Sequence, residues 1–142
     1  MREVTEVAVG VLIDKEGRFL MASRPQGKPY AGWWEFPGGK LEAGEAVTEA
    51  LSREYAEELG VKVKKATPWF VFEREYPHAY VRLHFCRIVD WEGQPQPREG
   101  QTFQWFETLK QAQTEKLLPM CSLVIERLML SDRVALVKTP LS

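Results

Sequence analysis

The chain has 142 residues, of which 44% are hydrophobic and 27% are charged, a size and composition typical of one folded domain. No run of residues is long and apolar enough to predict a membrane span. The formal charge of −1 lacks the surplus of Lys and Arg that a sequence-independent nucleic-acid binder needs. We therefore expect one soluble domain over residues 1–142, with no membrane and no nucleic-acid polymer as partner.

The N-terminal part is predicted to contain a hairpin, a loop and a short strand. Residues 4–14 and 17–24 carry strand-forming residues on either side of an Asp-Lys-Glu-Gly turn, which indicates a β-hairpin. Residues 25–32 hold two prolines and two glycines and are predicted to form an exposed loop of the kind that often holds ligands. An aromatic strand over 33–36 is predicted to end in a turn at residues 37–39, where glycines allow unusual backbone angles.

A helix is predicted over residues 45–59. The segment consists of good helix formers, and Leu51, Tyr55 and Leu59 form an apolar stripe at intervals of four residues. Gly60 suits the position directly after a helix. The helix is therefore expected to pack one face on a sheet.

The second half is predicted to be mostly strands. They cover residues 61–76, 78–91 and 101–108, with a Pro/Gly loop at 92–100. Pro119 fits the first turn of a last helix that runs to about Leu130, and residues 134–142 are expected to be a loose tail. The order β-β-β-α-β-β-β-α predicts an α/β fold, in which helices pack on a mixed sheet.

The cysteines indicate a reducing compartment. Cys86 and Cys121 stand in unrelated contexts, and no signal-peptide pattern follows the first residues. We expect reduced thiols in a cytoplasmic protein, although the sequence leaves one disulfide open.

Several aromatic and histidine side chains are interpreted as structural. Trp33, Trp34, Phe72 and Tyr76 offer a stacking surface for a purine, but aromatic residues on strands are more often part of a core. His84 has no Cys or His at metal-ligand spacing, so we expect it to be a surface or hydrogen-bonded histidine.

Three glutamates of the predicted helix need a counter-charge. Glu54, Glu57 and Glu58 fall at i, i+3 and i+4, so their carboxylates share one face about 5 to 6 Å apart. Arg53 is within reach of Glu57, whereas Glu54 has no basic residue four positions away in either direction. Glu57 and Glu58 also lie in the last turn, where the helix dipole favours cations. A solvated acidic face is the alternative, but the unpaired acids favour a bound cation.

The chemistry of these residues predicts which cation. Carboxylates without nearby Cys or His suit a hard ion, and Mg²⁺, with Mn²⁺ as a substitute, is commonly shared between carboxylates and substrate phosphates. A backbone carbonyl of the Gly38-Gly39 turn is predicted to join the ligands, and Lys40 to add positive charge near the phosphates.

The spacing of residues 39–61 resembles the signature of the Nudix hydrolase superfamily. Gly39, Glu45, the pairs Arg53-Glu54 and Glu57-Glu58, Gly60 and Val61 fill every fixed position of this Nudix box, and Tyr55 stands where an aliphatic residue is commoner. Residues 24–40 and 85–107 are further similar to the MutT branch, whose members hydrolyse 8-oxo-dGTP to its monophosphate and pyrophosphate. The resemblance implies the Nudix fold, an α/β/α sandwich around a mixed β-sheet.

The resemblance also implies roles for individual residues. The family uses the positions of Glu54, Glu57, Glu58 and the Gly38 carbonyl to bind Mg²⁺, that of Arg53 to orient the glutamates, and that of Glu54 as a frequent candidate for activating water. Lys40 is a candidate for assisting the reaction. The MutT branch contacts its nucleoside triphosphate substrate through residues at the positions of Arg24, Glu35, Phe36, Pro37 and Gly38. Monomer and homodimer both remain open.

Two positions depart from the MutT pattern. That branch selects oxidised guanine with an Asn at the start of the last helix, where this chain has Cys121 or Ser122, and neither offers an amide's paired donor and acceptor. An acidic residue in the loop before the last strand often assists the metals or the base, and Glu99 is the candidate here, with Gln104 at the nearer alternative position. The substrate therefore stays open between 8-oxo-dGTP and CTP or another (d)NTP. A non-catalytic Nudix fold that serves as a ligand sensor or interaction module is the alternative of another class.

Overall fold

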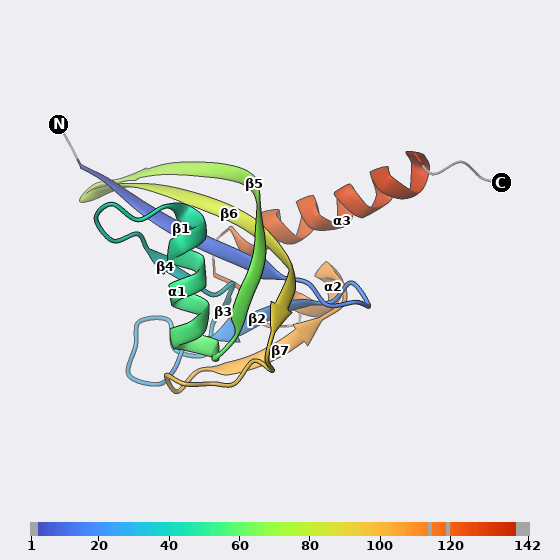
Figure 1. Ribbon diagram of the computed structural model, residues 1–142, viewed down its shortest axis with the longest axis horizontal. Helices are drawn as coiled ribbons and strands as arrows, with labels where there is room; N and C mark the ends of the chain where they lie inside the picture. Colours follow the sequence, from blue (N-terminus) through green and yellow to red (C-terminus); the bar gives the residue numbers. More distant parts are fainter. Residues whose placement is uncertain (1–2, 114, 119, 139–142) are drawn as a thin grey trace.

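The computed structural model describes residues 3–113, 115–118 and 120–138 (Figure 1). In chain order the elements are β1 (Val4–Leu12), β2 (Phe19–Ser23), β3 (Trp34–Glu35), β4 (Gly38–Lys40), α1 (Val47–Leu59), β5 (Lys62–Tyr76), β6 (Ala79–Glu92), β7 (Thr102–Phe106), α2 (Leu109–Ala112) and α3 (Cys121–Lys138). Among the described residues, no helix has both the length and the apolar character needed to cross a bilayer.

The strands form two sheets. The four-stranded sheet has the order β4-β1-β6-β5 and is mixed, because β1 and β6 run parallel while the other neighbours are antiparallel. The three-stranded sheet has the order β3-β2-β7 and is antiparallel. Helix α1 covers one face of the larger sheet, and α3 lies on its opposite side (Figure 1). The predicted α/β class, with helices packed on a mixed sheet, is confirmed.

The predicted hairpin of residues 4–14 and 17–24 is wrong beyond its turn, where the Asp14 amide donates to the Arg18 carbonyl oxygen at 2.9 Å. Ile13 and Phe19 form a single isolated antiparallel bridge, but β1 and β2 belong to different sheets. Strand β1 already pairs with β4 along one edge and with β6 along the other. Because a strand has only two hydrogen-bonding edges, β1 has none left for β2.

The predicted turn at residues 37–39 is also wrong, because Gly38 and Gly39 belong to β4. They lie opposite Val9 and Ala8 of β1, and neither glycine has a positive φ. A Cβ atom on Gly38 would collide with the carbonyl oxygen of Ala8. These glycines therefore permit close approach of the backbone rather than unusual backbone angles.

Helix α1 largely matches its prediction. It begins at Val47, two residues later than expected, and the Glu49 carboxylate accepts a hydrogen bond of 2.9 Å from the Ala46 amide at its start. Gly60 follows its end with φ of 71°, a left-handed conformation that glycine adopts without strain. The predicted apolar stripe is confirmed, because its three side chains are fully buried against the larger sheet.

The C-terminal region differs more from its prediction. The short helix α2 was not predicted, and α3 runs to Lys138 rather than to about Leu130. Pro119 and residues 139–142 lie outside the described residues.

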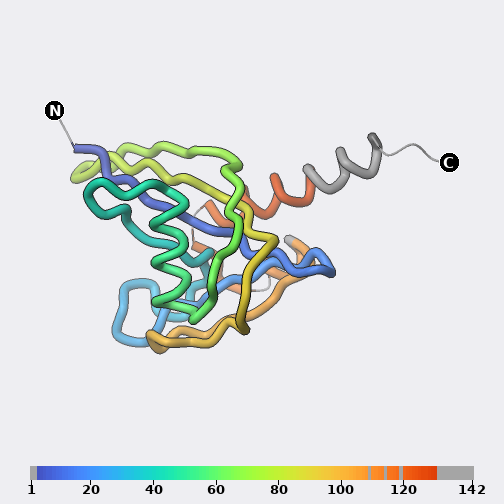
Figure 2. The backbone as a smooth tube through the Cα atoms, viewed as in Figure 1, coloured from blue at the N-terminus to red at the C-terminus, as the bar shows by residue number. Residues whose placement is uncertain are grey.

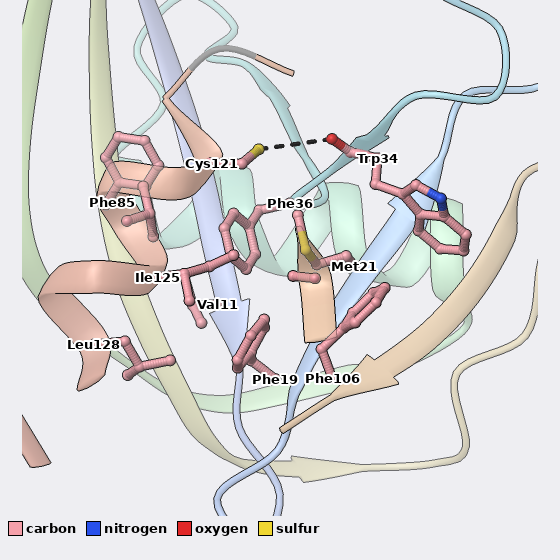
Figure 3. Packing of buried hydrophobic residues seen from close by; sticks show 12 residues of the cluster. Val11, Phe19, Met21, Trp34, Phe36, Phe85, Phe106, Cys121, Ile125 and Leu128 are labelled. Carbon is pink, nitrogen blue, oxygen red and sulfur yellow. Dashed lines mark hydrogen bonds between the residues drawn. The ribbon is translucent and has the colours of Figure 1, made fainter. Parts of the chain in front are cut away.

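A second core lies between the two sheets and α3. It contains Phe19, Trp34, Phe106 and Ile125, drawn with their neighbours in Figure 3. The expected structural role of Trp34 is confirmed. Its side chain is buried in this core, and its ring packs edge-on against that of Phe106 with 5.6 Å between the ring centroids. Figure 2 shows the loop between β2 and β3 (light blue) beside the loop between β6 and β7 (gold), and Pro25 and Gly100 meet there. These two loops border the pocket described next.

Candidate active site

A pocket of about 460 Å³ opens where the two sheets meet the end of α1. Seven of the residues predicted for the site line it, namely Arg24, Glu35, Phe36, Pro37, Gly38, Glu58 and Glu99. Lys28, Gln101 and Phe103 line the same pocket, although none of the three was predicted as a site residue. None of the four aromatic residues considered for purine stacking, Trp33, Trp34, Phe72 and Tyr76, is among its lining residues, whereas Phe36 and Phe103 are.

Arg24 and Glu35 form an ion pair on one wall of the pocket. The Arg24 guanidinium donates from Nε to Glu35 Oε2 at 2.9 Å and from Nη2 to Oε1 at 3.3 Å. The pair is positioned by the antiparallel pairing of β2 with β3, in which Ala22 lies opposite Glu35. Glu35 thus stands between two aromatic residues in the sequence because its side chain faces the pocket rather than the core.

Glu58 is the acid of α1 that faces the pocket. Burial, followed by the negative charges of Glu54, Glu99 and Glu35, raises the pKa of Glu58 from 4.5 to about 8. The Glu58 carboxyl therefore feels the charges of carboxyl groups from its own helix (Glu54), from the loop between β6 and β7 (Glu99) and from β3 (Glu35). Such crowding is unfavourable unless a cation or a proton offsets it.

Glu54 lies against the backbone of β4. A Cβ atom on Gly39 would overlap the Glu54 carboxylate, so only glycine at this position leaves room for that side chain. The prediction that Glu54 has no basic partner is wrong, because Arg53 Nη1 donates to Glu54 Oε1 at 2.8 Å. The long arginine side chain reaches its sequence neighbour, a contact that spacing along a helix face does not reveal.

Arg53, which does not line the pocket, bonds to several carboxylates and to the backbone of β4. Its guanidinium donates to both carboxylate oxygens of Glu45, at 2.8 and 2.9 Å, and to the Lys40 carbonyl oxygen at 3.0 Å. Arg53 Nη1 also lies 3.6 Å from Glu57 Oε2. The side chain therefore ties α1 to β4 and holds Glu54 and Glu57, as expected for a residue that orients the glutamates.

The Glu45 carboxylate gives a pH-dependent prediction. Its hydrogen bonds with Arg53, and one from the Glu42 amide, lower the pKa of Glu45 from 4.5 to about 2. A carboxylate whose pKa is lowered by folding adds stability above pH 4.5 and loses it as the pH falls towards 2. We expect wild type to be more stable than Glu45→Gln at pH 6, with the gap shrinking between pH 4.5 and 2. Urea unfolding of both proteins at several pH values checks this, and a gap that does not change with pH contradicts it.

Five predicted site residues lie outside the pocket lining, namely Lys40, Arg53, Glu54, Glu57 and Cys121. The Lys40 side chain is exposed at the end of β4, and 57% of the Glu57 side chain is exposed. Cys121 is buried behind β3, where its thiol donates to the Trp34 carbonyl oxygen across 3.7 Å (Figure 3). Burial raises the pKa of Cys121 to about 12, so this thiol stays protonated. Cys86 and Cys121 are both free, as predicted.

The residues present fit a hard divalent cation. Within the described ranges, no three His, Cys, Asp or Glu side chains converge into a preformed metal site, because Glu57 turns towards Arg53. The Glu54 and Glu58 carboxyl groups are hydrogen-bonding neighbours, however, and the Glu54 carboxylate lies directly beside the Gly39 backbone. His84 is engaged elsewhere, with Glu6 at 3.1 Å. The donors at this end are thus oxygens only, the set that Mg²⁺ and Mn²⁺ prefer.

An acidic helix thus borders a pocket formed where two sheets meet, and comparison with known proteins gives the family with this arrangement. The NUDIX domain family model matches residues 4–121. The chain therefore belongs to the NUDIX domain family, and it is a Nudix hydrolase.

The similar proteins agree with this assignment. The chain is 36% identical over 106 residues to an 8-oxo-dGTP diphosphatase of Haemophilus influenzae, covering 75% of this chain and 78% of the relative. It is also 36% identical over 97 residues to a CTP pyrophosphohydrolase of Escherichia coli, covering 68% and 72%.

Solved structures give the same result. A MutT structure from a study of Aliivibrio salmonicida and Vibrio cholerae superposes with a TM-score of 0.78 at 26% identity, covering 91% of this chain and 99% of the other. The E. coli ORF135 protein superposes with a TM-score of 0.78 at 30% identity, covering 94% of each chain.

Proposed function

We propose that the chain is a Mg²⁺-dependent nucleoside triphosphate pyrophosphohydrolase that converts 8-oxo-dGTP to its monophosphate and pyrophosphate. The observation that carries the proposal is the pocket, in which an acidic end at Glu58 and Glu99 faces a wall with the Arg24–Glu35 pair. The acidic end suits a metal-bound polyphosphate, and the wall with the Arg24–Glu35 pair suits a nucleoside. The 8-oxo-dGTP diphosphatase of H. influenzae supports the choice of nucleotide.

The acidic end is where Mg²⁺ binds in this proposal. Glu54, Glu57, Glu58 and the Gly38 carbonyl hold the ion, with Arg53 fixing the direction of Glu54 and Glu57. Bound Mg²⁺ supplies charge neutralisation for the phosphates and lowers the pKa of the attacking water. Glu54 accepts the proton of that water, Glu99 assists from the facing loop, and Lys40 adds positive charge at the rim.

The wall that bears Arg24 binds the nucleoside. Arg24 and Glu35 present donors and acceptors to the base, while Phe36 and Phe103 add aromatic surface. Cys121 supports the strand from behind rather than contacting the base, since its thiol already donates to Trp34.

CTP is the second candidate substrate. The E. coli CTP pyrophosphohydrolase is as similar to the chain as the first relative, at 36% identity. The start of α3 also lacks the amide with which the MutT branch selects oxidised guanine, because Cys121, which is buried, or Ser122 stands there. Base preference therefore depends on the Arg24–Glu35 wall.

A panel of nucleotides tests the proposal. We expect pyrophosphate release from 8-oxo-dGTP with kcat/KM at least about 10-fold above that for dGTP and CTP, because hydrogen-bonded base recognition discriminates strongly. Removal of Mg²⁺ with a chelator is expected to abolish the reaction, and Mn²⁺ to restore it. Equal rates for dGTP and 8-oxo-dGTP contradict the sanitising role, and a maximum for CTP selects the second candidate.

The same panel separates enzyme from binding module. If wild-type protein hydrolyses none of the nucleotides with Mg²⁺, the non-catalytic alternative is favoured. The proposal further places the enzyme in the cytoplasm, where the nucleotide pool and reduced thiols are found, as a monomer or homodimer. Gel filtration of the purified protein decides between the two.

A further inference from the structure

The loop between β6 and β7 caps the end of α1. The last carbonyl groups of a helix have no partner within it and must be satisfied from outside. Here the Leu59 carbonyl oxygen accepts from the Gln96 amide at 2.9 Å, and that of Glu58 accepts from the Arg98 amide at 3.3 Å. The Arg98 guanidinium lies over Gly60, so positive charge stands where the helix dipole favours it.

Gln101 makes two hydrogen bonds at this junction. Its Nε2 donates to the Glu58 carbonyl oxygen at 3.3 Å, and its Oε1 accepts from the Glu99 amide at 2.8 Å. A side-chain amide has both an N–H donor and a carbonyl acceptor, so this one side chain makes both hydrogen bonds. Gln101 thereby connects the backbone of Glu58 on α1 to that of Glu99 on the loop.

Both connected residues line the pocket from opposite elements. Glu58 comes from the last turn of α1 and Glu99 from an exposed loop with glycines on both sides, Gly93 and Gly100. The amides of Gln96 and Arg98 already hold the middle of this loop on α1, and Gln101 adds the hydrogen bond that reaches the backbone of Glu99 itself. The two hydrogen bonds of Gln101, here called the Gln101 clamp, join the backbones from which these two side chains extend.

We propose that Gln101 is a positioning residue that holds Glu99 opposite Glu58 at the metal-binding end of the pocket. The inference rests on the proposed function, since it assigns Gln101 a part in that hydrolysis. Gln101 does not itself touch the reacting atoms. It acts through the backbone of the two residues that it joins.

A double-mutant cycle tests the inference on the full chain. We expect Gln101→Leu and Glu99→Gln each to lower kcat/KM for pyrophosphate release by about 10-fold, because misplacement of a site group by an ångström is costly. The double variant is expected to have the same kcat/KM as either single variant, since both substitutions remove the contribution of a correctly placed Glu99 carboxylate. Gln96→Leu is the matched control, because only the backbone amide of Gln96 is used, and its activity should equal that of wild type.

A second measurement does not depend on activity. In the metal-free protein, hydrogen exchange at the Glu99 amide should be faster in Gln101→Leu than in wild type or Gln96→Leu, while the amides inside α1 keep their protection. Additive losses in the cycle, or unchanged exchange at Glu99, overturn the inference. An inactive wild type overturns the proposed function instead, and the exchange experiment still decides whether the clamp exists.

Discussion

Glu54→Gln is expected to lower kcat for nucleoside triphosphate hydrolysis by about 100-fold or more while the protein remains folded. The substitution removes a carboxylate that we assign both to Mg²⁺ and to the proton of the attacking water, and general base catalysis alone contributes about 100-fold or more. Glutamine keeps the size of the side chain and an oxygen that accepts from Arg53 Nη1, 2.8 Å away in wild type. The fold should therefore survive, as circular dichroism and thermal unfolding will show.

The matched control is Glu126→Gln, which makes the same chemical change at an exposed position of α3 outside the pocket. Its kcat should equal that of wild type. Binding of Mn²⁺, followed by the loss of the free-ion signal in electron paramagnetic resonance, should weaken in Glu54→Gln and stay unchanged in the control. A Glu54→Gln enzyme within threefold of wild type would exclude Glu54 from both roles.

The largest effect on stability is expected where Tyr55 meets Gly10. The Tyr55 hydroxyl is fully buried and donates to the carbonyl oxygens of Gly10 at 2.6 Å and Pro37 at 3.2 Å. Tyr55→Phe leaves a buried acceptor without its donor and should lower the free energy of unfolding by about 1 to 3 kcal/mol. Gly10→Ala should cost a similar amount by overpacking, about 1 to 3 kcal/mol, because its Cβ would overlap the Tyr55 hydroxyl.

The two substitutions are expected to couple. Removing the hydroxyl relieves part of the overlap, so Gly10→Ala with Tyr55→Phe should cost less than the sum of the single changes in urea unfolding. Tyr30→Phe is the control, since Tyr30 is 61% exposed and its loss of a hydroxyl should change stability by less than about 0.5 kcal/mol. Strict additivity would show that the two residues do not compete for space.

The same contact explains why the Nudix box of this chain departs from its family at position 55. A tyrosine fits there because Gly10, on β1, leaves space for a hydroxyl that two carbonyl groups then bind. The helix itself was predictable, since its apolar stripe and its glutamates repeat at helical intervals within one short segment. The glycine that makes room for Tyr55 lies 45 residues away, and no local pattern connects the two.

Other features were beyond sequence reasoning for a similar reason. The placement of β1 and β2 in different sheets depends on which strands pair with the edges of β1. One of those strands, β6, is far from β1 along the chain. The contact between Arg53 and Glu54 depends on side-chain conformation. The Gln101 clamp depends on a loop that returns to the end of α1, and its residues read in sequence as an ordinary Pro/Gly connection.

The corner at Ile13 and Phe19, where the chain passes from one sheet to the other, has a consequence for engineering. Arg24, Glu35 and Phe103 stand on or directly beside the strands of the three-stranded sheet, whereas Gly38 and Glu58 belong to the four-stranded sheet and the helix that covers it. The two sides of the pocket are thus carried by different sheets. Substitutions confined to Arg24, Glu35 and Phe103 can therefore alter which nucleotide is accepted, while β4 and α1, which carry Gly38 and Glu58, keep their structure.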